Sequence, residues 1–158
     1  MMPPDTVMDW MISLEQSGLG QAARASVWIY PVANLTHVLG AALLLGSIAT
    51  LDVAMLRRLP VATPLARIAI PIAAFGLLLQ IVSGGVLLAA EASALVRNPA
   101  FQLKMAMLLI GILNVAAFHL LAGGGLRRGD LDKARPFAAL SLAVWVVVLL
   151  AGRSIAYL

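Results

Sequence analysis

Four long apolar blocks constrain this 158-residue chain more than any other feature of its sequence. They cover about residues 29–55, 66–90, 101–122 and 136–157. A helix that crosses the hydrocarbon core of a bilayer needs about 20 mostly apolar residues, so each block is long enough to cross once. Hydrophobic residues make up 62% of the chain and charged residues 11%, which leaves too few charges to cover a water-soluble globule. The sequence therefore predicts an integral membrane protein.

The connections between the blocks predict how the helices are arranged. They are short, and they contain prolines or glycines, as in the runs RRLPVATPLAR and GGGLRRGDLDKARP. Three consecutive glycines are expected to end a helix. Short connections place consecutive helices antiparallel to each other. We therefore expect an all-α, up-down-up-down four-helix bundle that forms a single membrane domain over residues 1–158.

A short segment before the first block has its own pattern. Residues 7–17 can form a helix on the outer membrane surface, because Met8, Trp10, Met11 and Leu14 would give it an apolar side. The alternative is a disordered tail.

The distribution of basic residues predicts the orientation of the bundle. Lys and Arg are enriched in cytoplasmic connections. The first and third connections, which lie on the same side of the bundle, hold seven basic residues: Arg57, Arg58, Arg67, Arg127, Arg128, Lys133 and Arg135. Only four basic residues lie on the opposite side. This places both termini on the outer side of the membrane, in the periplasm if it is a Gram-negative inner membrane. Topology then explains the net charge of +4 without a nucleic-acid partner.

Several polar residues fall inside the outer halves of the blocks. At about 1.5 Å per residue, His37 lies roughly 10 Å below the outer boundary, Gln80 roughly 13 Å and Lys104 about 5 Å. Together with Arg153 they can form an outer polar cluster. Polar groups at depth are costly, so each is expected to have a partner or a function.

The faces of the blocks carry small residues beside these polar groups. Gly76, Gln80 and Gly84 recur every four residues and share one face, on which glycines permit close helix approach. Ala42 and Gly46 repeat this spacing in the first block, where His37, Gly40 and Leu44 make a neighbouring stripe. In the third block, Lys104 and Gly111 share a face. The polar residues are therefore expected to point into the bundle.

Two further ionisable residues lie near the inner ends of their helices. Asp52 and His119 are at comparable depths and can form an inner pair. We expect Asp52 to pair with Arg57 at the interface, in preference to acting as a proton relay.

Haem b is the sharpest cofactor hypothesis, with His37 as an iron ligand, because histidines of membrane helices commonly ligate haem. His37 and His119 differ in depth by roughly 17 Å, whereas two axial ligands are only about 4 Å apart. They cannot share one haem within a chain. Met105, Met107 or another subunit's histidine remain candidate partners for His37, as does an open sixth position, and Met55 is the equivalent for His119.

Other interpretations of the same residues stay open. His37 can be a neutral imidazole bonded to Gln80 or to a backbone carbonyl, it can serve a quinone site, or it can handle protons or ions. Lys104 can snorkel to the interface, or it can hold a haem propionate or a lipid headgroup.

Two patterns carry a resemblance to known proteins. One is W-x-Y-P-x5-H-x2-G-x5-G-S-x4-D from Trp28 to Asp52, and the other is N-P-x-F-x2-K from Asn98 to Lys104, with Asn114 beyond it. They resemble a group of small four-span bacterial inner-membrane proteins of unassigned function and, more distantly, the copper-resistance-D-type membrane proteins. The resemblance implies four spans, a bacterial inner membrane, and a place for His37 and Lys104 in the pattern. His119 lies outside it.

No catalytic motif is found in the sequence: there is no phosphate loop after a strand, no HExxH and no suitably spaced pair of carboxylates. The leading hypothesis is a non-catalytic inner-membrane subunit or anchor. It would pack against other membrane subunits or copies of itself and hold haem or quinone near the outer leaflet through His37. The alternative is a free-standing b-type cytochrome or electron-transfer protein, and metal or proton transport is a third class.

Overall fold

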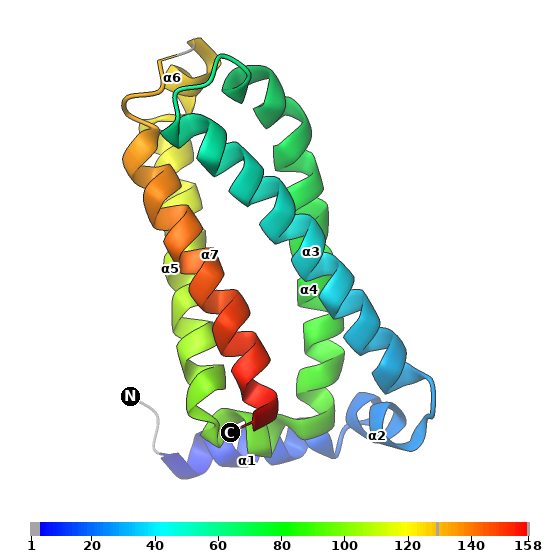
Figure 1. Ribbon diagram of the computed structural model, residues 1–158. Helices are drawn as coiled ribbons and strands as arrows, with labels where there is room; N and C mark the ends of the chain where they lie inside the picture. The colour runs from blue at the N-terminus through cyan, green and yellow to red at the C-terminus, as the bar shows by residue number, and fades with distance from the viewer. Residues whose placement is uncertain (1–3, 129, 158) are drawn as a thin grey trace.

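A computed structural model of the protein describes residues 4–128 and 130–157, and within these ranges all regular elements are helices. Four of them are long: α3 (Ile29–Leu56), α4 (Ala62–Arg97), α5 (Pro99–Leu121) and α7 (Arg135–Ser154), which a 3-10 turn, η1 (Ile155–Tyr157), extends. By length and composition each can cross a membrane. They run alternately up and down (Figure 1). The predicted all-α four-helix bundle is confirmed, and the fold is that of a multi-pass membrane protein.

The bundle is built from two helix pairs, in which α3 packs mainly on α4 and α5 mainly on α7. Contacts between α3 and α7 join the pairs, and α3 leans across the bundle toward the first turns of α7 (Figure 1). The closest approach between α3 and α4 is at Gly40 and Gly76, where an added Cβ on Gly40 would lie 2.8 Å from the Gly76 carbonyl oxygen. Gly46, by contrast, has no atom near its would-be Cβ. Gly40 and Leu44 therefore lie on the face of α3 that packs against α4, whereas Ala42 and Gly46 lie on an exposed face of the same helix.

Much of the apolar surface faces outward. In the apolar 18-residue stretch that qualifies each long helix as a membrane span, only 11–33% of the stretch is buried inside the bundle. Water would be a poor solvent for such a surface, so the outward-facing side chains indicate contact with a lipid bilayer.

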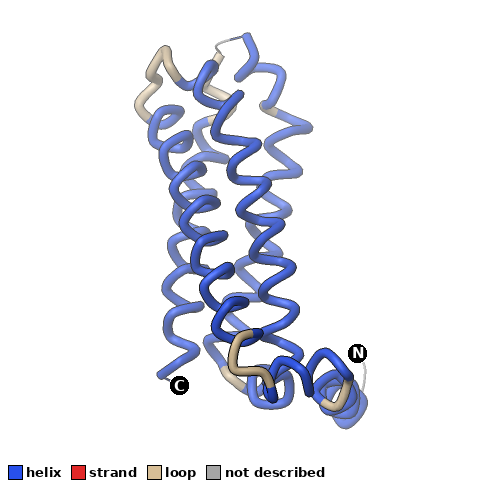
Figure 2. Tube along the Cα trace, turned by 90° about the vertical axis from the view of Figure 1, so that its right-hand side faces the viewer, coloured by secondary structure: helices blue, strands red, loops and turns tan. Residues whose placement is uncertain are grey.

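Two short helices lie across one end of the bundle. They are α1 (Pro4–Glu15) and α2 (Gly18–Ala25), and both pack against α4. Figure 2 shows them at the end that also holds η1, opposite α6. The predicted helix over 7–17 thus begins earlier and ends at Glu15, and α2 was not predicted. Met8, Met11 and Leu14 are partly covered, whereas Trp10 is 68% exposed, so Trp10 does not share their side.

Two helix boundaries differ from the expected ones. The helix of the second block continues past residue 90 to Arg97, through a kink at Glu91 where the backbone is not helical (φ −141°, ψ 34°). The three glycines of the third connection do not begin a loop. They form the first turn of a short helix, α6 (Gly123–Arg128), after α5 has ended at Leu121. Leu126 of α6 is buried against the core at this end of the bundle, so tertiary packing offsets the poor helix propensity of glycine.

Candidate functional site

The outer polar residues meet at one point of the bundle. The cluster consists of His37 from α3, Gln80 and Ser83 from α4, and Lys104 from α5, and we call it the His37 cluster. α7 contributes Gly152, whose would-be Cβ lies 3.5 Å from Lys104 Nζ. All four spanning helices therefore converge at the His37 cluster.

Hydrogen bonds occupy both ring nitrogens of His37. Nδ1 lies 3.0 Å from the Ser83 hydroxyl, and Nε2 lies 3.3 Å from Lys104 Nζ. The Gln80 amide donates to the His37 backbone carbonyl at 3.1 Å, and the Ser83 hydroxyl donates to the Leu79 carbonyl. An ammonium group can only donate, so Lys104 donates to Nε2, and Nδ1 then carries the hydrogen and donates to Ser83. This assigns a neutral imidazole in one tautomer from the direction of the bonds.

Glycines make room for the two large side chains. A Cβ on Gly84 would lie 3.1 Å from His37 Cε1, so the imidazole packs directly on the α4 backbone. Lys104 crosses from α5 toward α3 and passes over Gly152 of α7. Its ammonium group therefore points into the bundle. The expectation that Lys104 snorkels to the interface is wrong, because His37 offers an acceptor within reach of the side chain.

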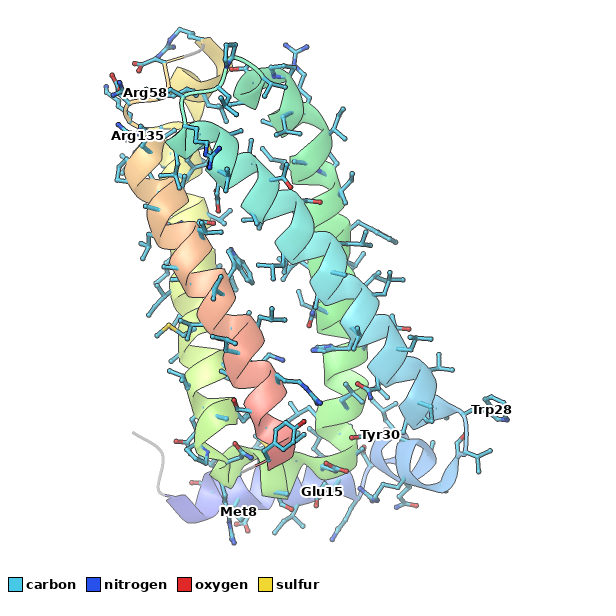
Figure 3. The ribbon with its side chains drawn as sticks, in the orientation of Figure 1. Met8, Glu15, Trp28, Tyr30, Arg58 and Arg135 are labelled. Atoms are coloured by element: carbon cyan, nitrogen blue, oxygen red, sulfur yellow. The ribbon has the colours of Figure 1, made fainter. Side chains whose placement is uncertain are left out.

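Among the described residues, no carboxylate lies within salt-bridge distance of Lys104. Within the described residues the one salt bridge joins Arg58 and Asp132 at 2.6 Å, and both side chains are exposed. It lies at the α6 end of the bundle, where Figure 3 labels Arg58 and Arg135, while Glu15, Trp28 and Tyr30 lie at the other end. An ammonium carries three donors, and the structure describes one hydrogen bond from Lys104 Nζ. Lys104 therefore has donor capacity left for a ligand.

Arg153 does not join the His37 cluster. It is exposed, donates to the Tyr157 hydroxyl at 2.7 Å and lies 5.0 Å from the centre of the Tyr157 ring. Both residues belong to the last turns of the chain, so a local contact replaces the expected one. Of the two candidate methionine ligands, Met105 is 48% exposed, and Met107 is half-buried, one turn deeper than Lys104.

The described residues fit haem ligation poorly. An iron ligand needs a free imidazole lone pair, and the lone pair of Nε2 faces the Lys104 ammonium. Iron could bind His37 only if Lys104 moved away. His119 is exposed, and its Nδ1 lies 2.8 Å from the Val115 carbonyl oxygen of its own helix. The centres of the His119 and Phe118 rings are 5.3 Å apart in an edge-to-face arrangement. Met55 is buried and His119 is not, so these two do not form an inner ligand pair.

The expected inner pairs of Asp52 are absent from the described structure. Asp52 is only 4% exposed and lies beside Ser141 of α7, whereas Arg57 and His119 are exposed. The pairing of Asp52 with Arg57 is therefore a wrong prediction. Five positions along a helix correspond to about 1.4 turns, so the two side chains leave α3 on different faces. The arginine that does pair is Arg58, with Asp132.

Comparison of the chain with models of known protein families, with curated proteins and with solved structures finds no match.

Sequence reasoning missed Ser83 and Gly152. Ser83 lies three residues after Gln80, a spacing that puts both on one helix face, so the face of Gly76, Gln80 and Gly84 contained the signal. Gly152 offered none, because a single glycine in an apolar helix does not indicate what passes over it.

Proposed function

We propose that the protein is a non-catalytic membrane subunit or anchor whose His37 cluster binds the headgroup of a quinone. One observation carries this proposal: the Lys104 ammonium points into the bundle, is bonded to a neutral His37 and has no carboxylate partner among the described residues. A cation held in this way at depth is costly unless it has a use.

The chemistry of the cluster favours a carbonyl ligand. A quinone oxygen is a hydrogen-bond acceptor, and Lys104 has unused donors. The tail of a quinone is apolar and needs an apolar path along the helices. A groove of about 430 Å³ follows the α5–α7 seam at this end of the bundle, lined by Leu103, Val147, Leu150 and Ala151 among others. Leu103 and Ala151 directly precede Lys104 and Gly152 in the sequence, so the groove lies at the same level along α5 and α7 as the cluster.

A b-type cytochrome is less well supported. It would require the contact between Lys104 and His37 Nε2 to break before iron could bind. Haem nevertheless gives a clear signal, so the same preparation tests both hypotheses.

The experiment compares the purified wild-type protein with Lys104→Met and with Lys133→Met, an exposed lysine in the connection before α7. Quinone that copurifies is extracted and separated by chromatography, and binding of decylubiquinone is titrated in detergent. We expect saturable binding by the wild type and by Lys133→Met, and a loss of at least about tenfold in affinity for Lys104→Met, equivalent to about 1.4 kcal/mol.

Two results would contradict the proposal. One is a wild-type protein that neither copurifies with quinone nor binds decylubiquinone saturably. The other is a Soret band with a positive pyridine haemochrome assay, lost in His37→Ala, which would identify a cytochrome.

The proposal extends to location and partners. The pattern from Trp28 to Asp52 supports membership of the small four-span bacterial group and a place in the bacterial inner membrane. The basic residues at the α6 end support an orientation with α1 and η1 on the periplasmic side. Only 11% of the apolar 18-residue stretch of α5 is buried. Its outward face is therefore available to lipid, to another subunit or to a second copy of the chain.

A further inference from the structure

A second polar site lies in the half of the bundle near α6. Its central residue is Asp52 of α3, which is 4% exposed and whose Oδ2 has no hydrogen-bond partner among the described residues. The Ser141 hydroxyl of α7 lies beside the Asp52 carboxyl group. One turn further along α7, Trp145 is also 4% exposed, and its Nε1 has no partner in the same part of the chain. Two deeply buried polar side chains, one on α3 and one on α7, thus have hydrogen-bonding atoms without a partner among the described residues.

The elements packed around Asp52 supply no counter-charge within salt-bridge distance among the described residues. On α7 the charged residue nearest to Ser141 in the sequence is Arg135, six positions earlier. The Nε atom of Arg135 is buried and has no hydrogen-bond partner among the described residues. α4 presents Ala66 and Ala69 to the core at this end. The remaining charged or titratable side chains of α3, α4 and α5 at this end are exposed: Arg57, Arg67 and His119.

An ionised carboxylate in this position would be unfavourable. A charge buried without a partner loses its hydration and gains no compensating interaction. A metal cation would relieve the cost only with several oxygen ligands around it, and the Ser141 hydroxyl is the polar group that lies beside the carboxyl. A proton needs one carboxyl oxygen and no cage of ligands.

We propose that Asp52 is a proton-binding site, in which the buried carboxyl group takes a proton from water at the α6 end and becomes a neutral acid. The donor is a hydronium ion: one of its O–H bonds breaks as the O–H bond on Asp52 forms, and a water molecule is left behind. This site is independent of the proposed quinone site.

An apolar layer separates the two sites. Leu44, Ala73 and Trp145 form a buried cluster, against which Leu108 and Val148 pack. On α7 this layer lies between Ser141, beside Asp52, and Gly152, under Lys104. His37 and Asp52 are 15 positions apart on α3, or roughly 22 Å along the helix. A proton on Asp52 therefore exchanges with the α6 end and not with the His37 cluster.

The test is infrared spectroscopy of the full chain reconstituted in liposomes at about pH 7, where free carboxyl groups are ionised. We expect a carboxylic-acid C=O stretching band that shifts on H/D exchange. Asp52→Asn should lose this band, whereas Asp132→Asn and Glu15→Gln should keep it. Ser141→Ala should shift the band to higher wavenumber, because the acid loses a neighbouring hydroxyl.

The helix content of each variant is checked by circular dichroism. If Asp52→Asn does not fold, carbon-13 labelling of the aspartates in the wild type replaces it, and the band should then move with the label. A wild type without a carboxylic-acid band, or a band that Asp52→Asn or the label leaves unchanged, overturns the proposal. So does a carboxylate band of Asp52 that responds to Na⁺ and not to pH, which would indicate a metal-ion site.

Discussion

Single glycines decide how closely the helices of this bundle can approach. At Gly76 an added Cβ would lie 2.6 Å from the Leu44 backbone nitrogen and 2.8 Å from the Gly40 carbonyl oxygen. These atoms belong to the backbone and cannot rotate away as a flexible side chain could. Glycine at this position therefore sets the spacing of α3 and α4, and with it the reach of Gln80 to the His37 carbonyl.

Replacement of Gly76 by Ala is expected to destabilise the bundle by about 1–3 kcal/mol, the usual cost of overpacking a tight contact. Gly46→Ala is the matched control, because it also lies within a spanning helix but has no atom within 4 Å of its would-be Cβ. Its effect should be no more than about 1 kcal/mol, in the stabilising direction. Unfolding in mixed detergent and SDS micelles, followed by circular dichroism, measures both. Equal unfolding midpoints for the two variants would contradict the close approach.

At the scale of elements, the pair α1–α2 holds the broken end of α4. The Glu15 carboxylate at the end of α1 accepts from the Ser93 backbone nitrogen at 2.8 Å and from the Ser93 hydroxyl at 2.9 Å. Arg24 of α2 donates to the Ala90 carbonyl at 3.0 Å. The kink at Glu91 leaves one helical segment ending before it and another beginning after it. Arg24 thus satisfies a backbone carbonyl before the kink, and Glu15 satisfies a backbone N–H group after it.

The attachment of α1 to α4 should depend on pH through Glu15. Hydrogen bonds from the Ser93 backbone and hydroxyl, and then the charge of Arg24, hold the pKa of Glu15 below its ordinary value, although burial opposes this. A lowered pKa in the folded state means that the stabilisation is complete above the ordinary glutamate pKa of about 4.3. It is lost as the pH falls through the lower pKa of the folded state.

Hydrogen exchange of the α1 amides measures this attachment. Protection of α1 should decrease as the pH falls below about 4, after correction for the intrinsic exchange rate. Glu15→Gln should show weak protection that no longer depends on pH in this range, while Asp9→Asn, which alters an exposed carboxylate of the same helix, should behave as the wild type. If Glu15→Gln retained the wild-type profile, Glu15 would not be the group that holds α1.

At the scale of the whole molecule, the ends of the bundle differ in charge and in covering. The α6 end carries exposed basic side chains, among them Arg57, Arg58 and Lys133. The other end is covered by α1 and α2 and carries exposed aromatic residues, of which Trp28 points away from the bundle (Figure 3). Basic residues favour the cytoplasmic side, and aromatic residues favour the membrane interface.

This asymmetry predicts the topology. Alkaline phosphatase fused after residue 157 should be active in bacterial cells, because it would be exported, and a fusion within the connection around residue 132 should be inactive. Fluorescent-protein fusions at the same positions should give the opposite pattern. If the C-terminal fluorescent-protein fusion were fluorescent and the C-terminal phosphatase fusion inactive, the predicted orientation would be wrong.

Much of the His37 cluster was predictable, because depth along a helix follows from counting residues. His37, Gln80 and Lys104 were expected at similar depths and do meet. Asp52 and Arg57 were expected to pair because they are close in sequence, and they do not, since direction around the helix axis also decides a contact. Whether any of these residues binds a cofactor stays a prediction.

The sequence by itself determined the four spanning helices, their alternating direction and the all-α class, because these follow from the length of each apolar block and the shortness of each connection. The tertiary structure decided which polar atoms meet. It directed Lys104 inward to His37, left Asp52 beside Ser141, and formed helices from residues 18–25 and 123–128. The physical reason is that apolarity and length are properties of one segment. Rotation about the helix axis and the capping of backbone groups depend on neighbours that lie far away in the chain.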